Sequence, residues 1–151
     1  MTDLRSLWTS YFPDVGSIIY LAPINAFDQF LVEDLDANRL EDSVTLWREV
    51  VSNRLLANAQ MVLFLNKCDL LKAKLDDGVR LCDYVKSYDG ANEYESVLVL
   101  PTEVFGSVPD RSSELFIYPT SMTDTGTMRI NLIANVQYSV LVENLKSLPL
   151  I

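Results

Sequence analysis

Three short apolar runs are spaced along the chain and predict a sheet. They cover residues 17–22, 61–65 and 115–118. Each run is too short for a helix, shows no alternation of apolar and polar positions, and ends at a polar or proline-bearing loop. Strands of a parallel sheet have this pattern because helices bury both of their faces. The runs therefore predict three parallel strands.

Helical periodicity fills the intervals between these runs. Apolar residues from Ala37 to Leu55 recur at spacings of three or four, which predicts an amphipathic helix. A shorter helical turn is expected over residues 27–33, and a second amphipathic helix from Ile130 toward Lys146. Strands and helices therefore alternate, which is typical of an open parallel α/β sheet with right-handed crossovers.

The segment over residues 98–114 is harder to place. Pro101, Gly106 and Pro109 interrupt any helical pattern there. We expect a poorly ordered loop, although compact domains rarely contain loops of this length. Three strands are also few for a parallel α/β domain, so the sheet is expected to be small.

Composition excludes several classes of function. Lys and Arg number 12 against 21 Asp and Glu, a net charge of −9, whereas nucleic-acid binding needs clustered basic residues. The absence of histidine excludes Ser-His-Asp systems and most zinc sites. The two cysteines are too few for a disulfide scaffold. Because no secretory signal or stretch of about 20 apolar residues occurs, we expect a cytoplasmic protein without a membrane span.

The loop after the second run reads Asn66-Lys67-Cys68-Asp69. Ligands of open parallel sheets bind at the carboxyl ends of the strands, where this loop would lie. A carboxylate there can accept two hydrogen bonds from the N1–H and 2-amino group of guanine, which adenine does not offer. The lysine stem can cover the base, and the asparagine amide can contact N7. A surface turn with Asp69 as a helix cap is an equally weighted alternative.

The loop after the third run changes this balance. It reads Thr120-Ser121-Met122-Thr123-Asp124-Thr125, and its backbone N–H groups could reach the O6 atom of guanine. Taken alone, this loop is better explained as the cap of the last helix. Two such loops on successive strands, however, would together form a pocket for the base.

The sequence resembles the C-terminal part of heterotrimeric G-protein alpha subunits nearly end to end. Residues 64–71 are similar to the guanine-specificity strand and loop of the family, and residues 120–125 to its T-C-A-T-D-T box. Residues 27–34 and 38–43 resemble the third-helix region. Residues 74–88 resemble fungal members of the family, and residues 144–146 resemble its receptor-contacting tail. Residues 98–114 resemble the family poorly.

This resemblance implies an α/β fold that is part of the Ras-like (P-loop NTPase) three-layer fold. About three parallel strands with flanking helices would be present, and the N-terminal half and helical domain would be lacking. Residues 1–151 would form the C-terminal portion of the GTPase domain. The first strand would then be an exposed apolar edge of the sheet, which is an aggregation hazard.

The resemblance also implies roles for individual residues. Asn66, Lys67 and Asp69 would bind guanine, and the backbone N–H of Met122 would meet the base oxygen. The family normally has alanine at the position of Met122, so the tightness of that contact would differ here.

A remnant of the second switch is implied at the N-terminus. Arg5 and Trp8 would belong to it, and Asp42 would replace the glutamate that meets the switch arginine. The simpler interpretation of Arg5 is a solvated charge that contributes about 0–1 kcal/mol. Trp8 is more simply a core residue.

Residues 127–151 would form the C-terminal helix and a receptor-coupling tail. The expected partners are a G-protein-coupled receptor and a beta-gamma dimer, the latter only through the segment near Trp8. These partners would bring the chain to the inner face of the plasma membrane. The tail residues assigned to receptor coupling are Asn144, Leu145, Lys146, Leu148, Leu150 and Ile151.

The hydrolytic half of the family is not found in this sequence. The five glycines never have the spacing of G-x-x-x-x-G-K-[ST], and the family's Mg²⁺ ligands, arginine finger and catalytic glutamine would all precede residue 1. We therefore expect weak GTP or GDP binding and no hydrolysis by the chain alone. Two alternatives stay open: a nucleotide-independent module that binds a receptor or partner, and an incomplete gene product.

Overall fold

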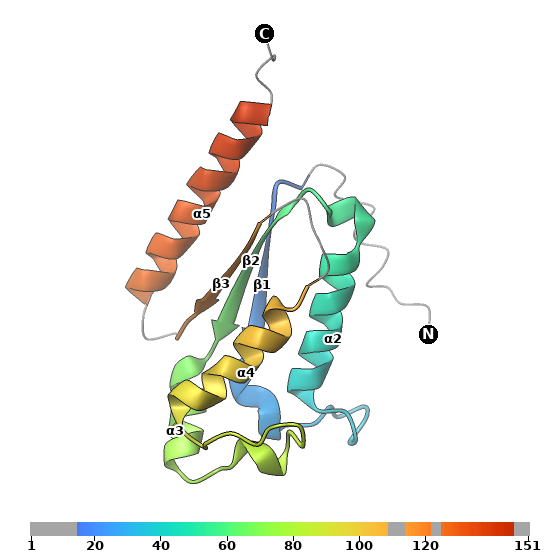
Figure 1. Cartoon of the computed structure of the whole chain (residues 1–151), viewed down its shortest axis with the longest axis vertical. Coiled ribbons are helices and arrows are strands. Elements are labelled where there is room, and N and C mark those ends of the chain that lie inside the picture. The colour runs from blue at the N-terminus through green and yellow to red at the C-terminus, as the bar shows by residue number, and fades with distance from the viewer. Residues whose placement is uncertain (1–14, 109–113, 122–124, 147–151) are drawn as a thin grey trace.

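The computed structural model describes residues 15–108, 114–121 and 125–146, and centres on a parallel sheet (Figure 1). Its strands are β1 (Ser17–Pro23), β2 (Gln60–Asn66) and β3 (Leu115–Pro119), in the order β1-β2-β3. Ser17 lies opposite Gln60, and Met61 lies opposite Leu115. The prediction of three parallel strands in an α/β fold is confirmed.

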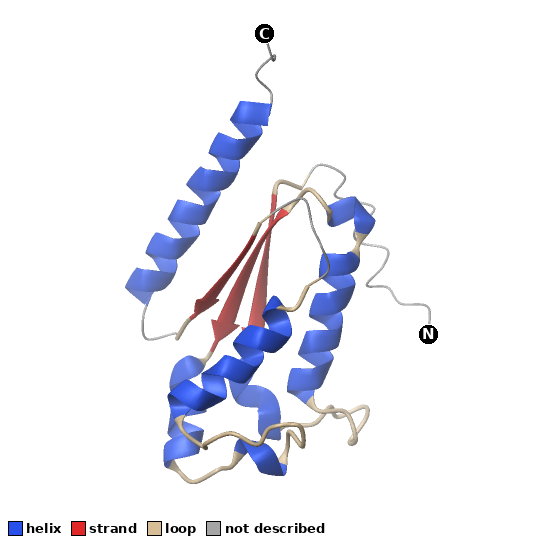
Figure 2. Cartoon of the chain, viewed as in Figure 1, coloured by secondary structure: helices blue, strands red, loops and turns tan. Residues whose placement is uncertain are grey.

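The helices lie on both sides of this sheet (Figure 2). Leu115 and Ile117 of β3 pack into the core on the side of α2 and α4, whereas Phe116 and Tyr118 contact α5 on the other. The helices are α2 (Arg39–Ser52), α3 (Cys68–Asp76), α4 (Tyr94–Gly106) and α5 (Thr125–Lys146), with short 3-10 turns η2 (Ile24–Asp28), η3 (Arg54–Leu56) and η4 (Leu81–Asp83).

Strand β2 forms the centre of the hydrophobic core. Its residues 61–65 are all buried, which explains why the sequence shows an unbroken apolar run there. Trp47 of α2 is also fully buried, and its indole N–H donates to the carbonyl oxygen of Phe105 in α4 at 2.8 Å. Its ring lies 5.1 Å from that of Tyr20 in β1, measured between centroids. The core therefore joins α2 and α4 to one face of the sheet.

Helix α2 confirms the predicted element between the first two strands, in shorter form. It begins after Asn38, whose side-chain oxygen accepts the backbone N–H of Leu40 at 2.9 Å. The helical turn predicted over residues 27–33 is only partly present, because η2 ends at Asp28. Residues 29–38 instead form a loop closed by an isolated bridge between Phe30 and Asn38.

The expected loop over residues 98–114 is wrong for residues 98–106, which belong to α4. A proline inside a helix removes one backbone hydrogen bond and costs about 3 kcal/mol. Here Val97, Pro101 and Phe105 are buried at spacings of four, and burying such side chains contributes about 1.5–3 kcal/mol each. Burial against α2 and the sheet therefore outweighs the cost of the proline. Residues 109–113 lie outside the described part of the chain.

Helix α5 orients its apolar residues differently from the sequence expectation. Asn135 is buried and its side-chain nitrogen donates to the hydroxyl of Tyr118 at 3.0 Å, while the ring of Tyr138 meets that of Phe116. These contacts fix the face of α5 that meets β3. The apolar residues that define the predicted helix are about half exposed or more: Ile130, Ile133, Val136 and Val140.

Strand β1 is the first strand in the order of the described sheet. Within the described residues β1 pairs with β2 alone. Ile19 and Leu21 are 47% and 51% exposed, so the strand presents two apolar side chains on its surface. In residues 15–108, 114–121 and 125–146, no helix is both long and apolar enough to cross a bilayer.

Candidate functional site

Two loops meet at the carboxyl edge of the sheet. Strands β2 and β3 are adjacent and parallel, so both end on the same side. The backbone N–H of Thr120 donates to the carbonyl of Leu65 at 2.8 Å, and the N–H of Cys68 donates to the carbonyl of Thr120 at 3.0 Å. The loop that follows β2 and the residues that follow β3 are therefore bonded directly to each other.

The turn between β2 and α3 has a strained backbone. Lys67 adopts φ = 64°, the left-handed conformation, and is the non-glycine residue with positive φ in the described ranges. This conformation costs a residue with a side chain about 1–2 kcal/mol. The side-chain oxygen of Asn66 accepts the backbone N–H of Lys67 at 2.9 Å and holds the turn. Strain of this kind is concentrated at functional sites.

Helix α3 starts immediately after this turn. Lys67 occupies the position before the helix, Cys68 is its first residue, and Asp69 lies in the first turn. The interpretation of Asp69 as the capping residue is therefore wrong in its detail. A carboxylate in the first turn is nevertheless favoured by the partial positive charge at the start of the helix.

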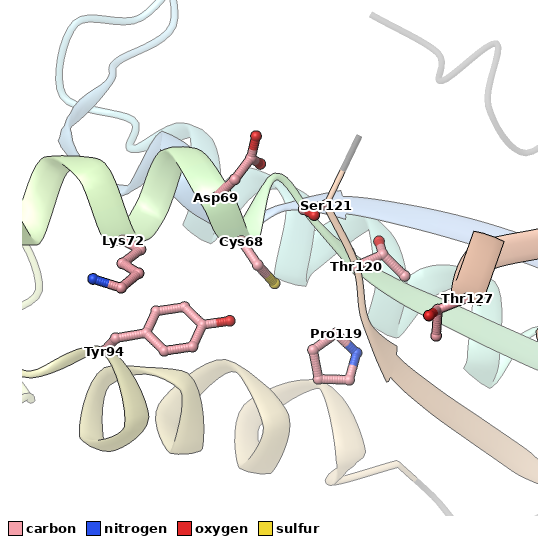
Figure 3. Close-up of a pocket in the computed structure, with 8 residues that line it drawn as sticks. All are labelled: Cys68, Asp69, Lys72, Tyr94, Pro119, Thr120, Ser121 and Thr127. Atoms are coloured by element: carbon pink, nitrogen blue, oxygen red, sulfur yellow. The ribbon is translucent and has the colours of Figure 1, made fainter. Parts of the chain in front are cut away.

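The carboxylate of Asp69 includes an oxygen atom that accepts no hydrogen bond from the described part of the protein. Its Oδ1 atom is buried and has no hydrogen-bond partner among the described residues. Leaving a buried acceptor without a donor costs about 1–3 kcal/mol. Figure 3 shows the carboxylate of Asp69 and the sulfur of Cys68 projecting from opposite sides of the start of α3, with the sulfur directed toward Tyr94. The carboxylate is thus available to a ligand that supplies donors.

A cavity of about 300 Å³ adjoins these loops (Figure 3). It lies between the start of α3, the start of α4 and the segment after β3. Lys67 does not line it, so the cavity extends beside the turn rather than over the lysine. The residues around it are Cys68, Asp69, Lys72, Tyr94, Pro119, Thr120, Ser121 and Thr127.

Burial sets the protonation of the cavity's thiol and phenol. Burial raises the pKa of the Cys68 thiol above its usual value, while a hydrogen bond from Tyr94 opposes that shift. The pKa of Tyr94 is also raised, first by burial and then by its hydrogen bond to Cys68. Both groups are therefore protonated at neutral pH, which suits hydrogen bonding and disfavours a role as nucleophile or base.

Sequence reasoning did not find Tyr94 or Lys72 as site residues. Tyr94 lies 25 positions beyond the Asp69 loop in sequence, and only the packing of α4 brings it there. Lys72 is one turn into α3 and forms an ion pair with Asp76 at 2.7 Å. The helical spacing of Asp69 and Lys72 on α3 was the signal that could have indicated the latter.

The other predicted residues are placed only in part. Asp42 lies half-buried in the first turn of α2, but Arg5 and Trp8, its expected neighbours, are outside the described residues. Met122 is also outside them. Of the predicted receptor-coupling residues, the backbone of Asn144, Leu145 and Lys146 ends α5, whereas Leu148, Leu150 and Ile151 lie outside the described part.

No group of three or more Asp, Glu, His or Cys side chains suited to a metal ion occurs in the described ranges. The residues that line the cavity combine one carboxylate with hydroxyl, thiol and lysine groups. This set of groups fits a ligand that donates hydrogen bonds, such as a heterocyclic base.

The fold and its paired loops define the class of this protein: an open parallel α/β sheet that forms part of the Ras-like fold. A family model described as G-protein alpha subunit matches residues 2–140. The chain belongs to the G-protein alpha subunit family.

Individual relatives agree with this assignment. The chain is 40% identical to the guanine nucleotide-binding protein alpha-4 subunit of Mycosarcoma maydis, over 94% of this chain and 26% of the relative. It is 38% identical to the alpha-9 subunit of Dictyostelium discoideum, over 83% of this chain and 36% of the relative. The chain is 33% identical to the guanine nucleotide-binding protein subunit alpha-13 of Mus musculus, over 97% of this chain and 39% of the relative. The chain thus spans about a quarter to two-fifths of these relatives.

Proposed function

We propose that the chain recognises the guanine base of a nucleotide as the base-binding part of a G-protein alpha subunit in receptor signalling. The observation that carries this proposal is the buried, unpartnered Oδ1 of Asp69 beside two directly bonded loops. Membership of the alpha-subunit family, and relatives named guanine nucleotide-binding proteins, support it.

The chemistry of guanine matches the groups of the loop. The carboxylate of Asp69 accepts the N1–H and the 2-amino group, and hydrogen bonds to a charged group contribute about 1.5–3 kcal/mol each. The side-chain oxygen of Asn66 is engaged with the N–H of Lys67, which leaves its amide nitrogen to donate to N7. The stem of Lys67 covers the base, and the backbone N–H of Met122 donates to O6. Adenine lacks the donor pair that Asp69 requires.

The affinity of these base-binding groups for a guanine nucleotide is low. Two hydrogen bonds to Asp69 contribute about 3–6 kcal/mol of binding free energy, and a cation over the ring of the base contributes about 0.5–2 kcal/mol. Association itself costs about 4–15 kcal/mol, which offsets most of this gain. We therefore propose a dissociation constant in the millimolar range for guanine nucleotides, with guanosine and GTP nearly equal. The phosphate, Mg²⁺ and hydrolytic groups of the family have no matching motif in this sequence, and we assign no hydrolytic step to this chain.

Nucleotide titrations followed by ¹H–¹⁵N NMR of the full chain test the proposal. GMP is expected to shift the amides of Asp69 and Ser121, IMP to bind several-fold more weakly because it lacks the 2-amino group, and AMP to leave them unchanged. Asp69→Asn removes the response to GMP. Asp76→Asn, at the exposed end of the same helix, is the matched control and retains it. Equal shifts with GMP and AMP, or full GMP binding by Asp69→Asn, contradict the proposal.

A second candidate is a module that binds a receptor or another partner through α5. The observation that favours it is an exposed apolar stripe formed by Ile130, Ile133, Val136 and Val140, opposite the buried Asn135. An apolar helix face of this kind suits docking into a groove. A peptide of residues 130–151 that competes with the chain for receptor-containing membranes supports this function, and failure to compete contradicts it.

A further inference from the structure

Hydrogen bonds at Leu65 join the two loops of the site, and the side chain of Tyr94 from α4 lies beside them. The carbonyl oxygen of Leu65 accepts the backbone N–H of Thr120 at 2.8 Å and the thiol of Cys68 at 3.2 Å. The side chains of Cys68 and Tyr94 line the same cavity, and an interaction with Tyr94 opposes the rise that burial causes in the pKa of the Cys68 thiol. Figure 3 shows the Tyr94 hydroxyl directed toward this sulfur across the cavity. The phenol of α4 therefore reaches the end of β2 through a single side chain.

We propose that Tyr94 is a positioning residue for guanine recognition, acting through Cys68 on the carboxylate of Asp69. This inference rests on the proposed function of the loop. Cys68 and Asp69 are the first and second residues of α3, so a displacement of Cys68 is passed directly to Asp69. Tyr94 defines where Cys68 lies, and thereby where the carboxylate meets the base.

The attachment of Tyr94 is rigid enough for this role. It lies in the first turn of α4, and Val97, one turn further, is 2% exposed. At the other end of α4, Phe105 is fully buried, and its carbonyl accepts the indole N–H of Trp47 at 2.8 Å. The hydroxyl of Tyr94 is thus held by a helix that is anchored at both ends to the core.

The direction of the hydrogen bonds follows from protonation. The pKa values of the Cys68 thiol and the Tyr94 phenol are both raised, so both groups keep their protons at neutral pH. The thiol donates to the carbonyl oxygen of Leu65, and the protonated Tyr94 hydroxyl is the group that can donate toward the sulfur. A serine at position 68 keeps both bonds in principle, whereas alanine removes both.

The test compares Tyr94→Phe with Tyr88→Phe in the full chain. The hydroxyl of Tyr88 donates to the carbonyl of Ala91 at 2.7 Å in an exposed turn away from the loops, which makes it a matched loss of one phenol bond. GMP titrations followed by NMR are expected to show a three- to tenfold weaker affinity for Tyr94→Phe. Tyr88→Phe stays within twofold of the wild type.

Two further measurements separate positioning from a merely structural contribution. In a Cys68→Ala background, Tyr94→Phe is expected to cause no further loss of GMP affinity, because the two residues act in series. In a Cys82→Ser background, Tyr94→Phe raises the pKa of the Cys68 thiol, since the bond that lowers it is lost. The thiol is titrated by the pH dependence of its alkylation rate.

The outcomes distinguish this inference from the function on which it rests. GMP binding by the wild type that is unchanged in Tyr94→Phe overturns the positioning role and leaves base recognition intact. An equal loss from Tyr94→Phe with and without Cys68 also overturns it, because the phenol then acts independently. A wild type that fails to bind GMP overturns both proposals.

Discussion

Two lysines of α3, two residues apart, form ion pairs of very different burial. Lys74 contacts the carboxylate of Asp28 in η2, donates to the carbonyl of Asn25 at 2.7 Å, and lies 5.6 Å from the ring centroid of Phe27. The side chains of Lys74 and Asp28 are 24% and 19% exposed. Lys72 instead pairs with Asp76 on the helix surface, where both side chains are more than half exposed.

Replacing each lysine by methionine separates the energetic roles of these pairs. Breaking a buried pair costs about 3–5 kcal/mol, because the remaining charge is left without compensation. The residual exposure of Asp28 lets water screen its charge, so we expect Lys74→Met to lower the free energy of unfolding by about 2–4 kcal/mol. Lys72→Met should lower it by no more than about 0.5 kcal/mol, as for exposed pairs at this helical spacing.

Urea unfolding followed by circular dichroism measures both differences. The double variant Lys74→Met with Asp28→Asn should be less destabilised than Lys74→Met alone, since the stranded charge is removed. Equal effects of Lys72→Met and Lys74→Met would refute the reasoning. So would a double variant whose loss equals the sum of the two single losses.

The remaining predictions concern the core, the sheet edge and the buried thiol. Leu63→Ala, at a fully buried position of β2, should lower the free energy of unfolding in urea by about 2–5 kcal/mol. A decrease below about 1 kcal/mol would contradict the placement of Leu63 in the core. Ile19→Lys with Leu21→Lys should reduce self-association measured by light scattering, since charges replace two exposed apolar side chains; unchanged association would count against an apolar contact through β1. Cys68, 6% exposed and with a raised thiol pKa, should be alkylated more slowly than Cys82 in mass spectrometry and gain reactivity only at alkaline pH. Reaction of Cys68 as fast as that of Cys82 at neutral pH would contradict its burial.

Strand β2 could be predicted from sequence because its environment is uniform. Residues 61–65 are buried on both faces of β2, so hydrophobicity alone marks the element. Because β2 and β3 are adjacent and parallel, their carboxyl ends lie at one edge of the sheet, so the sequence alone could place residues 66–69 near Thr120.

Helix α4 could not be predicted because its stability comes from tertiary packing. Pro101 is unfavourable in an isolated helix, and only burial of Val97 and Phe105 against distant elements offsets its cost. Tyr94 was missed for the same reason, since its contact with Cys68 exists only once α4 is in place. The face of α5 was likewise decided by Asn135 and Tyr138, whose partners on β3 are not evident from helical periodicity.

The most direct test of base recognition by Asp69 compares the affinities of the wild type and Asp69→Asn for GMP and for XMP, whose base is xanthine. Xanthine carries a carbonyl in place of the 2-amino group, so an asparagine amide can donate to it where a carboxylate is repelled. We expect the wild type to bind GMP at least tenfold more tightly than XMP in NMR titrations, and Asp69→Asn to reverse this order. An Asp69→Asn variant that keeps the wild-type preference would contradict the account, because the base would then be selected elsewhere.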